Sequence, residues 1–287
     1  MPHPDRLNGI IRALESGRHA FTLFAPTEVE TAVELQQSGY DGVVFEGEHR
    51  GWDIRAMRDS LQYLLNRAQI LQAGTPAPAV TPTARVPANG AEKNQFLAKQ
   101  ALDLGCYGIV WPHISTVEEA YNAVAACRYQ RLKDKPLYEP AGIRGDGPMQ
   151  ATRYWGLSQQ EYYAKADVWP LAPEGELFTV LQIEDTAGIR NLPDMLDNVP
   201  GIGAILIGEG DLSQELGYPR QTEHKAVLDA MAEVVAICKR KHVIVGHPHV
   251  TPANAERVIA EGYRYLMCAA PRSFANLNAA RALVGRG

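Results

Sequence analysis

The sequence predicts an α/β protein folded as a (β/α)8 barrel of the TIM type. Eight short apolar runs alternate with helical stretches along 287 residues, and no linker divides them. Repeated strand–helix units form a parallel sheet, and eight of them fit one closed barrel of this length. An open, doubly wound sheet is the alternative. The turn Phe24-Ala25-Pro26-Thr27 after the first strand lacks the GxGxxG motif that would favour it.

The first half of the chain contains four of these units. Its apolar runs predict strands at residues 19–24, 43–45, 79–86 and 107–111. The stretches that follow them predict helices at residues 28–38, 53–66, 91–104 and 117–127. Gly105 is the expected stop signal of the third helix, because glycine readily adopts the left-handed conformation that ends helices.

Residues 128–157 interrupt this alternation. The segment contains three prolines and four glycines and shows no sustained period. A loop this long inside a compact domain usually has a function, so we expect an active-site loop here.

The alternation resumes in the second half of the chain, after a helical piece at residues 158–166. The expected strands are residues 177–183, 204–207, 243–246 and 263–267. The expected helices include residues 225–239, 252–261 and, at the C-terminus, 273–284. We therefore expect a single barrel domain over residues 1–287.

Composition excludes several classes of protein. With 46% hydrophobic and 21% charged residues, the chain is neither disordered nor a coiled coil. No apolar run reaches the roughly 20 residues of a membrane span, and the N-terminus lacks a secretory signal. The net charge is −5, and the most basic segment, residues 128–135, is expected to be a solvated loop. The four cysteines form no CxxC motif. We expect a soluble, cytoplasmic protein with reduced thiols and no nucleic-acid or membrane partner.

Carboxylates follow two neighbouring strands of the expected barrel. Glu184 and Asp211 come just after the fifth and sixth strands, at the barrel face where active sites of this fold lie. Two carboxylates that leave water positions open suit Mg²⁺ or Mn²⁺. The alternative is that Asp211 caps a helix beginning at residues 212–213 and that Glu184 is a solvated loop acid. Their occurrence together favours a metal site.

His49 and Arg85 follow two further strands. His49 is a candidate acid or base because histidine titrates near neutrality. Arg85 follows an apolar strand, where a permanently charged guanidinium suits an enolate or carboxylate. Alternatively, Glu46 or Glu48 holds either residue in a salt bridge.

Three more histidines lie near strand ends. His247 and His249 flank Pro248, and alternate residues of an extended chain point to opposite faces. At most one of this pair should face the pocket, which disfavours a second metal site. His113, which follows Trp111-Pro112, is a similarly weak candidate.

At these positions the sequence resembles the HpcH/HpaI aldolase family, the metal-dependent class II pyruvate aldolases. The matching pieces occur in family order from about residue 19 to 275. They are Tyr40-Asp41-Gly42 with Glu48-His49, Ala84-Arg85-Val86-Pro87, Leu102-Asp103-Leu104-Gly105, Ile143-Arg144-Gly145 with Trp155-Gly156, Gln182-Ile183-Glu184, and residues 207–213 with 216–219. The resemblance implies a barrel of the phosphoenolpyruvate/pyruvate-domain type.

The resemblance also implies residue roles. Glu184 and Asp211 would hold the metal, which a 2-oxo acid would chelate through its carbonyl and carboxylate. Arg85 would stabilise the enolate, and His49 would transfer protons with the help of Asp103. Substrate binding is expected of Gln182, of the backbone at Gly210 and Asp211, and of Ser213 and His247.

Some residues depart from the family pattern. Glu46 stands in place of aspartate, and Glu209-Gly210 in place of Pro-Ala. His247 and His249 replace apolar residues, and the loop at residues 145–150 lacks the usual run of small residues. All these positions surround the expected acceptor pocket. Asp103 would end a helix at the opposite barrel face, so a neighbouring subunit would have to supply it.

The expected function is that of a divalent-metal-dependent carbon–carbon lyase. It would cleave a 4-hydroxy-2-oxo acid into pyruvate, or a related 2-oxo acid, and an aldehyde. The cofactor would be Mg²⁺, Mn²⁺ or Co²⁺, and the resemblance implies a homo-oligomer, either a hexamer or a trimer. The alternatives are an acyl-CoA lyase of the citrate-lyase-like or malyl-CoA-lyase-like type, and a non-catalytic barrel subunit.

Overall fold

The structure, a computed structural model, describes residues 6–87, 90–93, 95–270 and 283. Its parallel strands follow the order β1-β10-β9-β8-β7-β5-β4-β3-β2. β1 (Ala20–Thr22) and β2 (Phe24–Ala25) are parts of one strand interrupted at Leu23, so the order returns to its start. The Leu23 carbonyl accepts a hydrogen bond from Val44 N at 2.8 Å, which joins this strand to its neighbour. The sheet therefore closes into the expected (β/α)8 barrel.

The other strands of the ring lie close to their expected positions. They are β3 (Gly42–Glu46), β4 (Thr81–Arg85), β5 (Gly108–Trp111), β7 (Leu177–Ile183), β8 (Ala204–Ile207), β9 (Ile244–His247) and β10 (Tyr265–Met267). A further short strand, β6 (Val168–Trp169), pairs with β7 outside the ring. The sequence pattern does not predict this strand.

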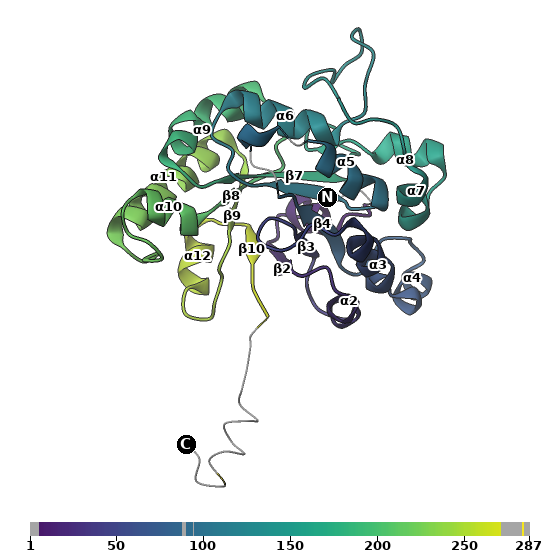
Figure 1. The fold of residues 1–287 in the computed structure, drawn as a ribbon, viewed down its shortest axis with the longest axis horizontal. Helices are drawn as coiled ribbons and strands as arrows, with labels where there is room; N and C mark the ends of the chain where they lie inside the picture. Colours follow the sequence, from purple (N-terminus) through teal and green to yellow (C-terminus); the bar gives the residue numbers. More distant parts are fainter. Residues whose placement is uncertain (1–5, 88–89, 94, 271–282, 284–287) are drawn as a thin grey trace.

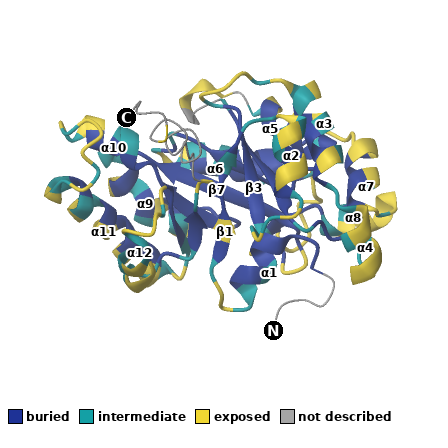
Figure 2. Cartoon of the chain, turned by 90° about the horizontal axis from the view of Figure 1, so that it is seen from below, coloured by how far each residue is buried: buried dark blue, intermediate teal, exposed yellow. Residues whose placement is uncertain are grey.

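Helices cover the outside of the barrel (Figures 1 and 2). Their exposed residues lie on the outer surface, whereas the strands between them are buried (Figure 2). In the first half the helices are α2 (Val29–Leu35), α3 (Ile54–Leu64), α4 (Arg67–Ala73), the 3-10 turn η1 (Gly90–Glu92), α5 (Phe96–Leu104) and α6 (Val117–Cys127). In the second half they are α7 (Met149–Trp155), α8 (Gln159–Lys165), α9 (Thr186–Asn198), α10 (Glu209–Glu215), α11 (Lys225–Lys241) and α12 (Ala255–Glu261). The helix expected at residues 273–284 falls almost entirely outside the described residues.

An N-terminal helix closes one end of the barrel. α1 (Gly9–Glu15) inserts its buried Ile10 and Ile11 among the inward-facing strand residues. Asn8 caps this helix, and its side-chain amide donates to the carbonyl of Tyr107, at the start of β5. These contacts place α1 at the amino ends of the strands. A functional cavity must therefore open at the opposite, carboxyl end.

The segment at residues 128–157 is more ordered than expected, because it contains α7. Trp155 ends this helix, stacks on Tyr107 with ring centroids 4.1 Å apart, and donates to the Gly105 carbonyl at 2.9 Å. The expectation of a solvated basic loop is also wrong for Arg128. Its buried guanidinium pairs with Asp167, with Nε 2.7 Å from Oδ1. Aromatic packing and this ion pair hold the segment against the barrel.

Two properties of the chain complete this description. Among the described residues, no helix is long and apolar enough to cross a membrane. The cysteines are all free, and three of them are buried (Cys106, Cys127 and Cys238).

Candidate active site

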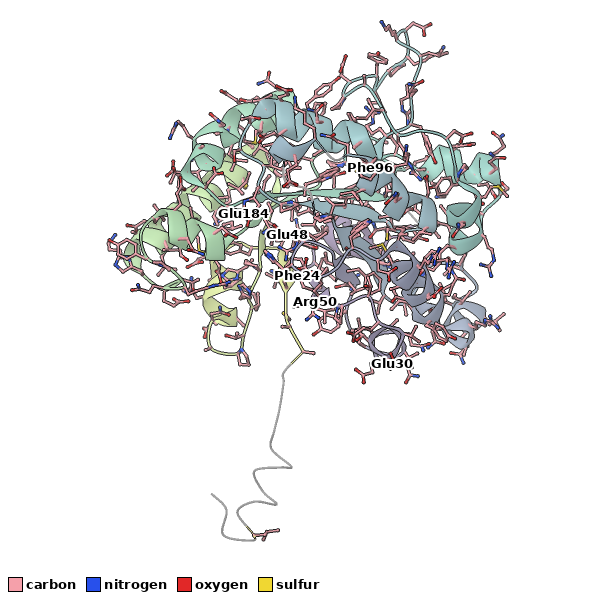
Figure 3. The ribbon with its side chains drawn as sticks, viewed as in Figure 1. Phe24, Glu30, Glu48, Arg50, Phe96 and Glu184 are labelled. Atoms are coloured by element: carbon pink, nitrogen blue, oxygen red, sulfur yellow. The ribbon has the colours of Figure 1, made fainter. Side chains whose placement is uncertain are left out.

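A cavity of about 140 Å³ opens at the carboxyl ends of the strands. The residues predicted there from strand ends contribute to its lining: His49, Arg85, Gln182, Glu184 and Asp211, together with Gly210. A wider cavity of about 420 Å³ also includes Phe24 and His49 in its lining, and adds Glu46 and Arg50. Figure 3 shows Phe24, Glu48 and Glu184 gathered at this end of the barrel. The two cavities adjoin through their shared residues.

Arg85 is held in place by carboxylates on both sides. Its Nε donates to Glu46 Oε1 at 3.1 Å, and Nη2 pairs with Glu46 Oε2. Nη1 lies 2.8 Å from Glu48 Oε2 and 3.4 Å from Gln182 Oε1. The guanidinium carbon sits 4.2 Å from the centroid of the Phe24 ring. The salt bridges considered as an alternative are therefore present, and they fix the orientation of a guanidinium that lines the cavity.

Glu184 is a buried carboxylate at the end of β7. Its Oε1 accepts from His113 N at 2.8 Å, and its Oε2 accepts from Gln182 Nε2 at 2.7 Å. A Cβ at Gly208 would collide with this carboxylate, so glycine there leaves room for it. Burial raises the pKa of Glu184, against the lowering effect of His113, and the nearby Glu48 carboxylate raises it further. Gln182 thus holds Glu184 in position, as expected of a residue beside it.

Glu48 and His113 join Glu184 in a compact group. His113 Nε2 lies 3.4 Å from Glu48 Oε1, and its Nδ1 lies 3.8 Å from Glu184 Oε1. The hydrogen bond to Glu48 is the main reason that the pKa of His113 rises to about 9, despite its partial burial. The Glu184 charge raises it further. The sequence indicates Glu48 only as a possible salt-bridge partner and His113 only as a weak candidate.

This group fits a divalent cation. One ligand atom from each of Glu48, His113 and Glu184 lies within 4.8 Å of the others. Oxygen and imidazole donors together suit a first-row divalent metal or Mg²⁺. Two carboxylates that burial brings together also repel each other, and a cation would relieve this repulsion. Asp211 lines the same cavity on the first turn of α10 but is not a member of the trio.

His49 faces the open side of the site. Its side chain is 66% exposed, and its Nε2 lies 3.6 Å from Glu48 Oε2. Glu46 Oε1 accepts from the backbone N of Glu48 at 2.7 Å and of His49 at 3.3 Å, which fixes the turn after β3. This histidine can therefore contact both a bound molecule and solvent.

Two residues predicted to bind substrate do not line this cavity. Ser213 is buried, and its Oγ donates to the Gly210 carbonyl and accepts from Arg220 N. It therefore shapes the loop rather than contacting the opening. His247 is also buried, whereas His249 lines the cavity. One histidine of the pair reaches the site, as the alternation argument allowed, but it is His249.

The helix that contains Asp211 begins at Glu209, earlier than expected.

Asp103 lies away from the barrel mouth. It is near the end of α5, where it accepts from Arg144 Nη2 at 2.8 Å. Burial raises its pKa, although Arg144 lowers it. Arg144 lines a separate cavity of about 550 Å³, together with Tyr129 and Tyr163. The structure therefore does not bring Asp103 to His49 within one chain.

The site at the carboxyl ends of the strands is consistent with the family that the sequence matches. The family model described as HpcH/HpaI aldolase/citrate lyase matches residues 21–270. The chain belongs to this family. Aldolases and citrate lyases both cleave a carbon–carbon bond, so HpcH/HpaI membership identifies the chain as a member of a family of carbon–carbon lyases. The expected resemblance is confirmed.

Individual relatives in the HpcH/HpaI family support this assignment. The 2-keto-3-deoxy-L-rhamnonate aldolase of Klebsiella pneumoniae is 28% identical over 229 residues, covering 80% of this chain and 74% of the relative. The hydroxypyruvate/pyruvate aldolase of Roseobacter denitrificans is 30% identical over 241 residues, covering 84% and 80%. A crystal structure of a family member from Burkholderia cenocepacia superposes with a TM-score of 0.77 at 26% identity, covering 97% of this chain and 98% of the other.

Proposed function

We propose that this protein is a divalent-metal-dependent aldolase. It cleaves a 4-hydroxy-2-oxo acid into pyruvate, or a closely related 2-oxo acid, and an aldehyde, by way of the enolate of the 2-oxo acid. The observation that carries the proposal is the grouping of Glu48, His113 and Glu184 beside Arg85 at the barrel mouth of an HpcH/HpaI family member. Pyruvate and hydroxypyruvate are the 2-oxo acids named for the Roseobacter relative, and both are small enough for such a site.

Four side chains are proposed to hold the metal. Glu184 and Asp211 are the ligands implied by the family resemblance, and Glu48 and His113 lie close enough to Glu184 to join them. A bound Mg²⁺, Mn²⁺ or Co²⁺ would supply Lewis-acid polarisation of the 2-keto oxygen. Gln182 keeps the Glu184 carboxylate in position through its amide.

The remaining residues bind the substrate and move protons. Arg85 presents a guanidinium whose orientation is fixed by Glu46, Glu48 and the Phe24 ring, so it can stabilise the negative charge of an enolate without reorganising. His49 is exposed enough to exchange protons with solvent, and it is proposed to take the proton of the 4-hydroxyl. The backbone at Gly210 and Asp211 is proposed to receive the substrate carboxylate.

The proposal includes a homo-oligomer, either a hexamer or a trimer, in the cytoplasm. Asp103 does not reach the barrel mouth of its own chain, so a role beside His49 requires a neighbouring subunit. Its partner Arg144 and the cavity around Tyr129 and Tyr163 would then lie close to that subunit interface. Free, largely buried thiols are typical of proteins in reducing compartments.

Pyruvate release from a panel of 4-hydroxy-2-oxo acids tests this proposal. The expected result is release by protein loaded with Mg²⁺, Mn²⁺ or Co²⁺, loss after treatment with EDTA, and recovery when the metal is restored. Glu184→Gln should bind the metal far more weakly, because a neutral amide replaces an anionic ligand. Full activity in exhaustively chelated protein would overturn the metal-dependent mechanism.

A further inference from the structure

Two histidines and one buried glutamate form a network on the wall of the cavity between β8 and β9. His249 Nδ1 lies 2.7 Å from Glu209 Oε1, and His247 Nε2 lies 3.7 Å from Glu209 Oε2. Only 7% of the Glu209 side chain is exposed, but 60% of the His249 side chain is. The glutamate is thus enclosed, while the ring that it holds borders the opening.

The network fixes which ring nitrogen of His249 carries a hydrogen. A carboxylate only accepts hydrogen bonds, so Nδ1 of His249 must donate to Glu209. Its other ring nitrogen, Nε2, is not engaged by Glu209 and remains able to hydrogen-bond with a bound molecule. His247 behaves in a matching way: its Nδ1 accepts from the backbone N of His249 at 3.2 Å, which leaves its hydrogen on Nε2, on the side of Glu209. Both imidazoles therefore direct a donor toward one carboxylate.

The His249 ring shares the lining of the cavity with Glu209, Arg220 and three residues that have no polar side chain. His249 lines the cavity, and its neighbours there include Pro248, Gly208 and Gly210, which have no polar side chain. Among the described residues, the recorded hydrogen bonds of the His249 ring involve Nδ1 alone. Arg85 and Phe24 line the same cavity. The wall thus offers an imidazole held in a fixed orientation, in the same cavity that the proposed ligand Asp211 lines.

We propose that the Glu209–His249 pair selects substrates that carry a hydroxyl group next to the reacting carbons. The Nε2 atom of His249 forms a hydrogen bond with that hydroxyl, and Glu209 holds the ring in position. This inference rests on the aldolase function proposed above and specifies its substrate class. The hydroxyl has two chemical sources: C3 of a 3-hydroxy-2-oxo acid, or the α-carbon of an α-hydroxyaldehyde.

The energetic basis is the cost of leaving a polar group unsatisfied. A substrate with a methyl or hydrogen in place of the hydroxyl would displace water from Nε2 without replacing its hydrogen bond. Sites built around a substrate hydroxyl discriminate strongly against analogues that lack it. Because His249 remains partly exposed, we expect a selectivity of about tenfold. This factor corresponds to the free energy of one neutral hydrogen bond.

Two pairs of aldol reactions, followed as kcat/KM, test the inference and separate the two sources. In the first pair hydroxypyruvate is compared with pyruvate as donor, with the same aldehyde. In the second, glycolaldehyde is compared with acetaldehyde as acceptor, with pyruvate as donor. His249→Leu should lower the preference for the hydroxylated substrate about tenfold in one of the pairs. His249→Gln, which keeps a hydrogen-bonding group there, should retain much of it.

A matched control and two distinct failures complete the test. His19→Leu makes the same change next to β1, at the closed end of the barrel, and should leave both ratios unchanged. Unchanged ratios for His249→Leu in both pairs, in an enzyme whose unsubstituted form is active, would overturn this inference alone. Absence of any metal-dependent carbon–carbon bond formation by the unsubstituted protein would overturn the proposed function, and this inference with it.

Discussion

At the scale of single residues, Arg85 makes the most demanding contribution to the proposed mechanism. It contacts Glu46 through Nε and Nη2, and Glu48 and Gln182 through Nη1. Lysine would supply a charge but only one nitrogen, so it could not keep these contacts together. We expect Arg85→Lys to bind the divalent ion with little change and to lose most turnover, roughly 100-fold or more. Metal titration and steady-state kinetics measure the two effects. Near-normal turnover would exclude the role assigned to the guanidinium.

His113 leads to a prediction for the pH dependence of the metal-free protein. Its pKa in the fold is about 9, above the ordinary histidine value of 6.5, chiefly because of its hydrogen bond to Glu48. A raised pKa means that the protonated form is favoured by folding. The resulting stability is fully present below about pH 6.5 and is lost as the pH rises through about 9.

Urea denaturation of the metal-free protein at several pH values measures this loss. His113→Gln, which cannot titrate, should remove the part of the pH dependence that lies between these two values. If the variant and the unsubstituted protein lose stability in parallel over that range, the ion pairing assigned to His113 is wrong.

Much of the site could be predicted from strand ends, but the directions of its side chains could not. His49, Arg85, Gln182, Glu184 and Asp211 line one cavity, as the barrel geometry requires. The position of His113 depends on a backbone φ of 50° just after β5, which a residue pattern does not reveal. The same limit applies to His247 and His249: alternation indicated that one should face the cavity but not which.

At the scale of secondary-structure elements, α1 is the clearest case of an element that the sequence pattern concealed. It has only seven residues, and its stability comes from insertion into the barrel rather than from helix propensity. Ile10 is fully buried, and its side chain occupies the space that a Cβ at Gly42 would need. α7 was missed for a related reason, because the glycines and prolines around it indicate a loop while Trp155 packs in the core.

Truncation of Ile10 tests the structural role of α1. Ile10→Ala should reduce the free energy of unfolding by about 3 kcal/mol, through lost burial and a cavity that the barrel cannot fill. Urea denaturation measures this change. Ile259→Ala on α12 is a suitable control, because Ile259 is 44% exposed and should contribute much less. Equal effects of the two substitutions would show that α1 does not seal the barrel.

At the scale of the whole molecule, the barrel order explains why distant segments meet. β4, β5 and β7 are neighbours in the ring, so Arg85, His113 and Glu184 come together although about 100 residues separate the first from the last. The sequence alone could predict this gathering once eight strand–helix units were recognised. It could not predict how copies of the chain assemble, because one chain shows no subunit interface.

Subunit mixing tests the assembly that we propose. If Asp103 acts beside His49 of a neighbouring subunit, inactive Asp103→Ala and inactive His49→Ala proteins should regain partial activity after subunit exchange. Hybrid oligomers would contain some sites with both groups intact. Demonstrated exchange without recovered turnover, or full activity of a strict monomer, would rule out a shared site.

The exchange of pyruvate methyl protons with D₂O tests the central claim most directly, because enolate formation needs no knowledge of the aldehyde. Nuclear magnetic resonance follows the loss of the methyl proton signal in the presence of the protein. The account predicts rapid exchange with Mg²⁺, Mn²⁺ or Co²⁺ bound, and near-background exchange after chelation or in Glu184→Gln. Exchange that proceeds equally fast in exhaustively chelated protein, or that is absent with every metal, would contradict it.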